Sequence, residues 1–177
     1  GFTTHYEYDA LGRQILITYH DGTTVASTYD AGNRRLSLND SASGVLAWDY
    51  DGLDRIVRVV SAQGEVNYGY DLAGRRTSMV ADNQPEMRYM YDDGDRLIGQ
   101  QQLGEVVEYT YDSVNRRTSM TLPNQVRAGY AYNEGSQLTG LAWSRGGRAL
   151  GNLGYAYDNR GLVVSQTGTF SSKSLPS

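Results

Sequence analysis

The chain has 177 residues, 39% of them apolar and 20% charged, so it can bury a hydrophobic core and does not have the composition of a disordered tail. A net charge of −4 argues against nucleic-acid binding, and no apolar run approaches the roughly 18 residues that cross a membrane as a helix, so we expect no membrane insertion. The absence of cysteine excludes disulfides and thiolate chemistry.

An internal repeat is the most informative feature of the sequence, which also contains 15 tyrosines against 2 phenylalanines. Eight copies of a motif that begins with a Tyr-Asp pair or its variant recur at intervals of 21, 21, 20, 21, 20, 21 and 25 residues. We number the motif tyrosine as position 0. The tyrosines are Tyr8, Tyr29, Tyr50, Tyr70, Tyr91, Tyr111, Tyr132 and Tyr157.

Three further positions of the motif predict a turn. Position +1 is Asp9, Asp30, Asp51, Asp71, Asp92, Asp112, Asn133 and Asp158. Position +4 is Gly12, Asn33, Asp54, Gly74, Asp95, Asn115, Ser136 and Gly161, and seven of these eight are residue types that tolerate a positive φ. Position +5 is Arg13, Arg34, Arg55, Arg75, Arg96, Arg116, Gln137 and Leu162. The aspartate can accept hydrogen bonds from backbone N–H groups two residues on, while the +4 residue adopts the left-handed conformation.

The residues on both sides of this turn predict β-strands. Position −2 is aromatic in seven of the eight copies, so two aromatic side chains lie on one face of the preceding strand. Apolar residues at +7 and +9 alternate with mostly small or polar residues at +8. Turn residues such as Asp21-Gly22 and Gly104 close each unit. We therefore predict an all-β chain of about sixteen short strands in one curved antiparallel sheet, with eight repeats over residues 1–170 and a flexible polar tail over 171–177.

The aspartate and arginine columns have two interpretations. They resemble catalytic or ligand-binding groups, but recurrence in successive copies favours a structural role, because an active site is usually built once. The seventh copy changes both residues together, to Asn133 and Gln137, as expected if the two side chains touch. We predict no catalytic residue, no cofactor and no metal ligand.

Other candidate sites are weaker. His20, beside Asp21-Gly22, fits a turn residue, and no zinc or Ser-His-Asp constellation is legible. The DDGD stretch at 92–95 resembles a calcium loop but matches the repeat turn instead. The irregular segment 140–152, with Trp143 and two arginines around Gly146-Gly147, is either a longer hairpin tip, which we favour, or a partner-binding loop.

The motif resembles the YD repeat of RHS-repeat proteins, with YDALGR at 8–13 and YDLAGRR at 70–76 close to the consensus. This family includes bacterial polymorphic toxins, insecticidal toxin-complex subunits and animal teneurins. The resemblance implies a spiralling β-sheet that closes as a hollow shell, or β-cocoon, around a toxin in bacterial members. Eight units are too few to close such a shell, so we expect a segment of one. The family's Asp-Pro-x-Gly segment with its protease aspartates is absent from these 177 residues, so no catalytic residue is transferred.

The resemblance implies a structural segment of a shell that encapsulates and helps deliver a toxin, in a secreted or cell-surface bacterial protein. Its partners would be the remaining repeats and the toxin domain of the parent protein, and exposed sheet edges predict self-association. A second hypothesis is an aromatic-rich repeat module that binds a cell-wall glycan or a cell-surface partner. An enzymatic function has little support.

Overall fold

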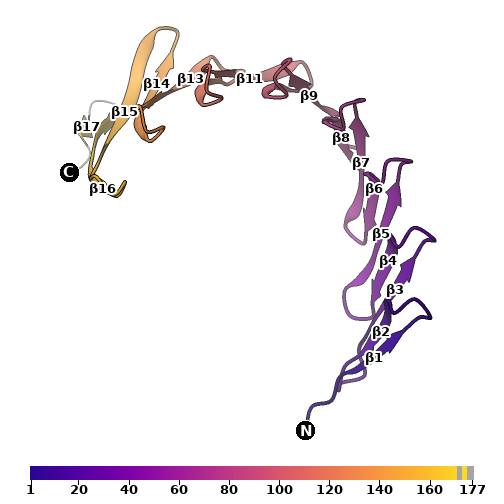
Figure 1. Cartoon of the computed structure of the whole chain (residues 1–177). Helices are drawn as coiled ribbons and strands as arrows, with labels where there is room; N and C mark the ends of the chain where they lie inside the picture. The colour runs from indigo at the N-terminus through magenta and orange to yellow at the C-terminus, as the bar shows by residue number, and fades with distance from the viewer. Residues whose placement is uncertain (171–172, 175–177) are drawn as a thin grey trace. The chain divides into compact units, whose positions relative to one another are not determined.

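The computed structural model describes residues 1–170 and 173–174 and divides the chain into two units, Gly1–Met87 and Arg88–Ser177. Within the described residues every regular element is a β-strand, which confirms the predicted all-β fold (Figure 1). The first unit contains the strands β1 His5–Tyr8, β2 Gln14–Thr18, β3 Thr24–Tyr29, β4 Arg35–Asp40, β5 Gly44–Tyr50, β6 Ile56–Ser61, β7 Gly64–Tyr70 and β8 Arg76–Ala81.

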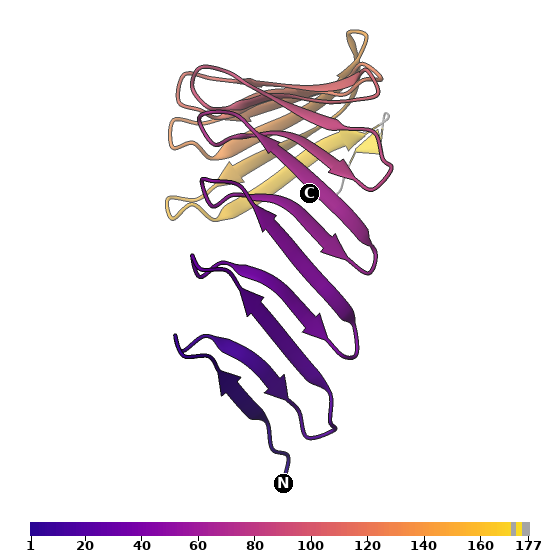
Figure 2. The ribbon, with the colours of Figure 1, turned by 90° about the vertical axis from the view of Figure 1, so that its right-hand side faces the viewer.

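The second unit begins within β9 and continues the same arrangement. Its strands are β9 Met87–Tyr91, β10 Leu97–Gln102, β11 Glu105–Tyr111, β12 Arg117–Thr121, β13 Val126–Tyr132, β14 Leu138–Arg145, β15 Arg148–Tyr157, β16 Val163–Phe170 and β17 Lys173–Ser174. In each unit every strand pairs antiparallel with the next one along the chain, as Figure 2 shows for β1–β8. The predicted tail lies mostly outside the described residues, and its described part, Lys173–Ser174, pairs with β16.

Each YD motif forms the same hairpin turn. In the first copy the N–H of Gly12 donates to the carbonyl of Asp9 at 3.0 Å, and the N–H of Asp9 donates to the carbonyl of Arg13 at 2.9 Å. This pattern is a three-residue loop, in which a type I turn is followed by a left-handed residue that starts a bulge. All eight residues at position +4 have positive φ, between 61° and 85°. The prediction for this column is confirmed, and it extends to Ser136, whose residue type does not favour that conformation.

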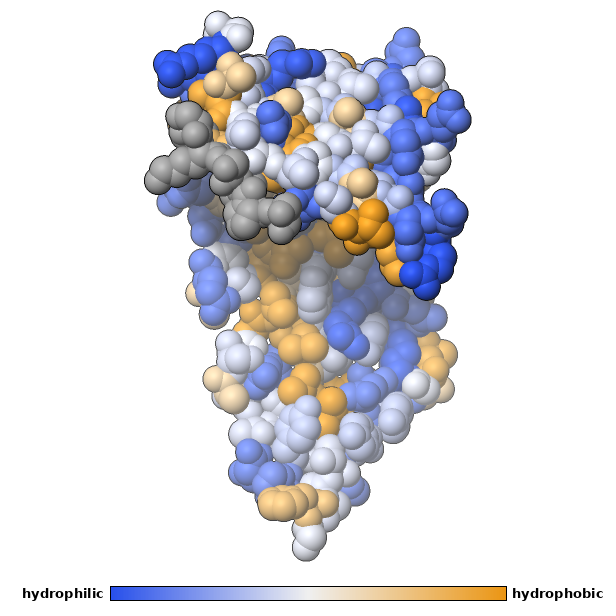
Figure 3. All heavy atoms as spheres, turned by 90° about the vertical axis from the view of Figure 1, so that its left-hand side faces the viewer, coloured by the Kyte–Doolittle hydropathy of each residue, from blue (hydrophilic) through white to orange (hydrophobic). Residues whose placement is uncertain are grey.

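The sheets are single layers, so few side chains are buried. Among the described residues Ala128 and Ser119 are only 4% and 3% exposed, and no large side chain is completely buried. Cross-strand pairs such as Ile17–Val25 instead shield each other within one face. Hydrophobic residues gather in a band on the face of the first unit that Figure 3 presents in its lower half. No second layer covers the aromatic face in the described residues of either unit, so its rings are half-buried or exposed.

The segment 140–152 is a longer hairpin tip, as predicted. The strands β14 and β15 continue through it with paired residues up to Arg145 and Arg148, and only Gly146 and Gly147 form the loop. Both glycines have positive φ, 55° and 81°, as the turn at the tip of a two-residue hairpin requires.

Leu103 occupies the first position of another such turn, with a φ of 52° before Gly104 at 83°. A leucine in the left-handed region costs about 1 kcal/mol relative to an unstrained conformation, and its side chain is 80% exposed, so it contributes little packing. Leu103→Asn is therefore expected to stabilise the protein by about 0.5–1 kcal/mol. Urea denaturation measures this change, and Leu103→Val, whose branched side chain suits the turn less well, is expected to destabilise; the reverse order would contradict the prediction.

Candidate structural site at the repeat turns

The motif aspartate binds its own turn through both carboxylate oxygens. In the first copy Oδ1 of Asp9 accepts hydrogen bonds from the backbone N–H groups of Leu11 at 2.9 Å and Arg13 at 3.0 Å. Its Oδ2 accepts from Nε of Arg13 at 2.6 Å. Equivalent backbone and Nε contacts occur at Asp30, Asp51, Asp71, Asp92 and Asp112. The carboxylate thus fixes the turn and the direction of the arginine side chain.

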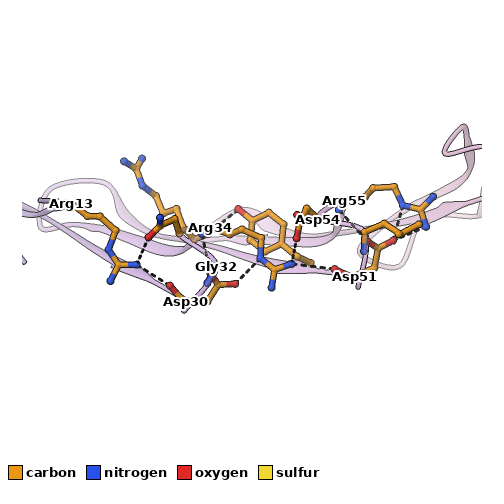
Figure 4. Close-up of polar contacts among 11 residues, drawn as sticks. Arg13, Asp30, Gly32, Arg34, Asp51, Asp54 and Arg55 are labelled. Carbon is orange, nitrogen blue, oxygen red and sulfur yellow. Dashed lines mark hydrogen bonds and ion pairs between the residues drawn. The ribbon is translucent and has the colours of Figure 1, made fainter. Parts of the chain in front are cut away.

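The arginine then reaches the turn of the next repeat. Nη1 of Arg13 donates to the backbone carbonyl of Asp30 at 2.8 Å (Figure 4). It also donates to Oδ1 of Asn33 at 3.1 Å. Arg34 makes the same two contacts with the Asp51 carbonyl at 3.2 Å and Asp54 at 2.7 Å. The second unit repeats both contacts at Arg96 and Arg116. We call this chain of contacts the Asp–Arg ladder.

The motif tyrosine joins the same pair of repeats. The hydroxyl of Tyr70 donates to the carbonyl of Ile56, which precedes it by 14 residues, at 2.8 Å. The guanidinium of Arg55 lies over the Tyr70 ring, 4.7 Å from its centre. The same two contacts occur at Tyr29, Tyr50, Tyr111 and Tyr132, and Tyr157 makes the hydroxyl contact. The hydroxyl explains the use of tyrosine rather than phenylalanine at position 0.

The last two copies vary the ladder. Nδ2 of Asn133 donates to Oε1 of Gln137 at 2.7 Å, so an amide pair replaces the ion pair in the seventh copy. In the eighth copy position +5 is Leu162, and Asp158 accepts instead from the exposed Arg160 at 3.0 Å. The sequence-predicted contact between the +1 and +5 side chains is therefore present in the seventh copy and is displaced to Arg160 in the eighth.

Sequence reasoning missed two kinds of contact. The +4 side chain was assigned only a conformational role, whereas Asn33, Asp54, Asn115 and Ser136 also accept a hydrogen bond from the arginine of the preceding copy. The arginines at position +6 were not singled out. Arg35 lies over Tyr29 at 5.7 Å, Arg76 over Tyr68 at 4.4 Å, and Arg117 over Tyr109 and Tyr130 at 4.9 and 5.9 Å. The hydrogen bond to the +4 side chain could have been found in the sequence, because every residue at position +4 that is not glycine carries a side-chain oxygen.

The other candidates belong to turns. Asp92 binds the N–H groups of its own turn, and Asp95 has a φ of 62°, so the DDGD stretch is a repeat turn, as predicted. The ring of His20 lies edge-on to Phe2 with centres 4.3 Å apart. Among the described residues no three histidine or acidic side chains gather as a group that could hold a metal ion. The part of the chain that the structure describes also contains no helix with the length and hydropathy to span a bilayer.

Hydrogen bonds lower the pKa of the ladder carboxylates. At Asp30 the backbone N–H of Arg34 and then its side chain lower the pKa below the usual 3.8, and at Asp51 the side chain of Arg55 has the largest effect. Outside the ladder, Arg58 and then Asn67 lower the pKa of Glu65 to about 2. These carboxylates therefore bind fewer protons in the folded state than in the unfolded chain.

Stability is expected to fall as the pH decreases through this range. A carboxylate with a lowered folded pKa stabilises the fold above its unfolded pKa and loses that contribution as it becomes protonated in the folded state. The loss should begin near pH 4 and continue towards pH 2, and because the ladder repeats, the carboxylates should act together. Urea denaturation at pH 7, 4, 3 and 2 measures this effect. A denaturation midpoint that stays constant down to pH 2 would contradict it.

The chain resembles proteins of known structure. The teneurin YD-shell family model matches residues 2–121. The fold is similar to TcdB2-TccC3 without its hypervariable C-terminal region, with a TM-score of 0.75 and 18% identity over 92% of this chain and 10% of that chain. It is also similar to TcdB2-TccC3, with a TM-score of 0.66 and 15% identity over 94% and 12% of the two chains. The Photorhabdus luminescens Tc holotoxin pore gives a TM-score of 0.69 and 16% identity over 94% and 12%. No curated protein matches.

Repeated β-hairpins with an Asp–Arg contact in each turn place this chain in the class of YD-repeat β-proteins. The chain belongs to the teneurin YD-shell family, since the match covers residues 2–121 of 177. It spans about a tenth of the length of the solved structures that it resembles.

Proposed function

We propose that this chain is a structural segment of an RHS-type shell that encapsulates a toxin and helps deliver it. The Asp–Arg ladder carries the proposal, because each repeat is bonded to the next through the arginine, the +4 side chain and the tyrosine hydroxyl. Those polar groups are used to join repeats, which suits a continuous wall. Membership of the YD-shell family supports the same role.

We propose the rest of the parent protein as the partner of this segment, namely its other repeats and an enclosed toxin domain. An exported bacterial protein fits this role, since a Tc holotoxin pore is among the similar structures. The proposed role assigns no catalytic residue, cofactor or metal to the segment. The motif residues, from Tyr8 and Asp9 to Asp158 and Gly161, would act structurally.

Protease protection of the parent protein tests the proposal. The region that follows the repeats should resist proteinase K in the intact parent and be digested rapidly when it is expressed alone. Asp51→Ala, which removes one carboxylate from the ladder, should shorten the protection, while Leu72→Ala, at a side chain fully exposed in a turn, should not. Equal digestion of this region in the wild-type parent and in isolation would contradict encapsulation.

Glycan or cell-surface binding is the second candidate, and the accessible aromatic face favours it. Tyr6 and Tyr8, both on the first strand β1, are 52% and 58% exposed, while the other tyrosines at positions −2 and 0 are half-buried, so β1 offers the rings that are most open to a ligand. A change of tyrosine fluorescence on addition of soluble cell-wall fragments, lost in Tyr6→Ala, would support binding. An unchanged spectrum and melting temperature would argue against it.

Self-association of the 177-residue chain is expected to depend on concentration. The edge of an antiparallel sheet presents N–H and C=O groups in the geometry that pairs with another strand. Light scattering from 5 μM to about 500 μM should therefore show a rising average mass. A constant monomer mass across this range would contradict the expectation.

A further inference from the structure

The tip of the long hairpin carries two arginines that face each other. Arg145 and Arg148 are cross-strand partners on either side of Gly146-Gly147, and both are exposed. Neither forms an ion pair with any residue that the structure describes. Like charges directly opposite each other destabilise a strand pair, so an anion that neutralises both would be bound favourably at this tip.

The tip is accessible and differs in charge from the other turns that join repeats. Residues 145–148 are all exposed, so the two arginine side chains are accessible to solvent. Four of the corresponding turns carry a carboxylate in the turn or beside it, at Asp21, Asp40, Asp82 and Glu105, and the turns at 61–64 and 122–125 are uncharged. The chain as a whole has a net charge of −4, so this basic tip is a local reversal of its charge.

An apolar hollow lies on β14–β16 beside this tip. It has a volume of about 280 Å³ and is lined by Trp143, Asn152, Leu153, Thr169 and Phe170. Trp143 and Phe170 meet edge to face, with ring centres 6.5 Å apart and planes inclined at 76°. Trp143 precedes Arg145 by two residues on β14, so both side chains lie on one face of the strand, about 7 Å apart along it.

We propose that this hairpin binds an acidic polypeptide segment that inserts one bulky apolar side chain into the hollow and places carboxylates against Arg145 and Arg148. The hollow, at about 280 Å³, lies at the lower end of the roughly 300–1,000 Å³ range of small-molecule sites and has room for one bulky side chain. The planar guanidinium groups match carboxylates in a two-point geometry. Tryptophan and arginine are the residues that most often dominate protein-protein binding. A polypeptide is favoured over a sulfated glycan because the hollow is lined mainly by Trp143, Leu153 and Phe170.

Fluorescence anisotropy of a labelled peptide with the sequence Glu-Glu-Trp-Glu-Glu tests the proposal on the complete 177-residue chain. The peptide should bind saturably. Gln-Gln-Trp-Gln-Gln and Glu-Glu-Ala-Glu-Glu should each bind at least tenfold more weakly, because one lacks the charges and the other lacks the side chain for the hollow. Circular dichroism confirms that each variant of the chain retains its β-sheet.

Arg148→Gln should weaken binding of the acidic peptide about tenfold, the scale of one lost charge-assisted contact. Arg160→Gln is the matched control, since it removes the same charge from another exposed arginine and should change binding less than twofold. Equal losses in the two variants would overturn the site, because they would indicate a general effect of net charge. Binding of heparin that depends on Arg148, without binding of the acidic peptide, would overturn the polypeptide assignment.

Discussion

Tyr70→Ala is expected to lower the free energy of unfolding by about 3 kcal/mol, the largest effect of any single substitution in the repeat motif. The substitution removes a half-buried ring, the surface on which the Arg55 guanidinium lies, and the hydroxyl that donates to the Ile56 carbonyl. Each of these contacts joins one repeat to the next, so the loss affects the junction between two hairpins. Urea denaturation followed by near-ultraviolet circular dichroism measures the change.

Tyr70→Phe separates the hydroxyl from the ring. It retains the ring under Arg55 and removes one hydrogen bond, so a loss of about 1 kcal/mol is expected. A double-mutant cycle that combines Tyr70→Ala with Arg55→Gln should show that the two decreases in the free energy of unfolding are not additive, because the residues contact each other. If Tyr70→Ala and Tyr70→Phe are equally stable, the tyrosine ring does not stabilise the junction between the two hairpins.

Gly168→Ala is expected to destabilise the protein by about 2–3 kcal/mol, because the added methyl group has no space. A Cβ at this position would overlap the backbone carbonyl oxygen of Asn152 and lie 2.8 Å from Cδ2 of Leu153. A backbone atom cannot move aside as a flexible side chain can, so β15 and β16 would have to separate locally. Hydrogen exchange should therefore accelerate at the amides of these two strands before it does so elsewhere.

Gly52→Ala is the matched control for this substitution. Nothing lies within 4 Å of a Cβ built at Gly52, and its backbone is not left-handed, so the change in stability should stay within about 0.5 kcal/mol. A Gly168→Ala variant as stable as Gly52→Ala would mean that the two strands can move apart at little cost.

The repeat allowed most of the fold to be predicted because each hairpin is encoded locally. The turn needs an acceptor at +1 and a left-handed residue at +4, and both columns are visible without any alignment. Ser136 shows the limit of residue preference, since its φ of 61° is imposed by the same turn hydrogen bonds as in the other copies.

Contacts between repeats were less predictable because they depend on strand register. The pairing of Arg13 with Asn33 joins residues 20 positions apart, and spacing alone does not indicate which columns align. The hollow beside the hairpin tip was equally hidden. Trp143 and Phe170 belong to different strands, β14 and β16, and they meet because Gly151, their shared partner on the intervening strand β15, has no side chain between them.

The ladder also gives the chain a chemical polarity. Each arginine donates to the repeat that follows it, so a repeat that lacks its C-terminal neighbour has a guanidinium without its acceptors. A repeat that lacks its N-terminal neighbour leaves a carbonyl, a +4 side chain and a tyrosine hydroxyl, all of which water can satisfy. During synthesis a new hairpin would therefore complete the bonding of the hairpin made just before it. The contacts between repeats would therefore form in the order of synthesis, from the N-terminal repeat towards the C-terminal one.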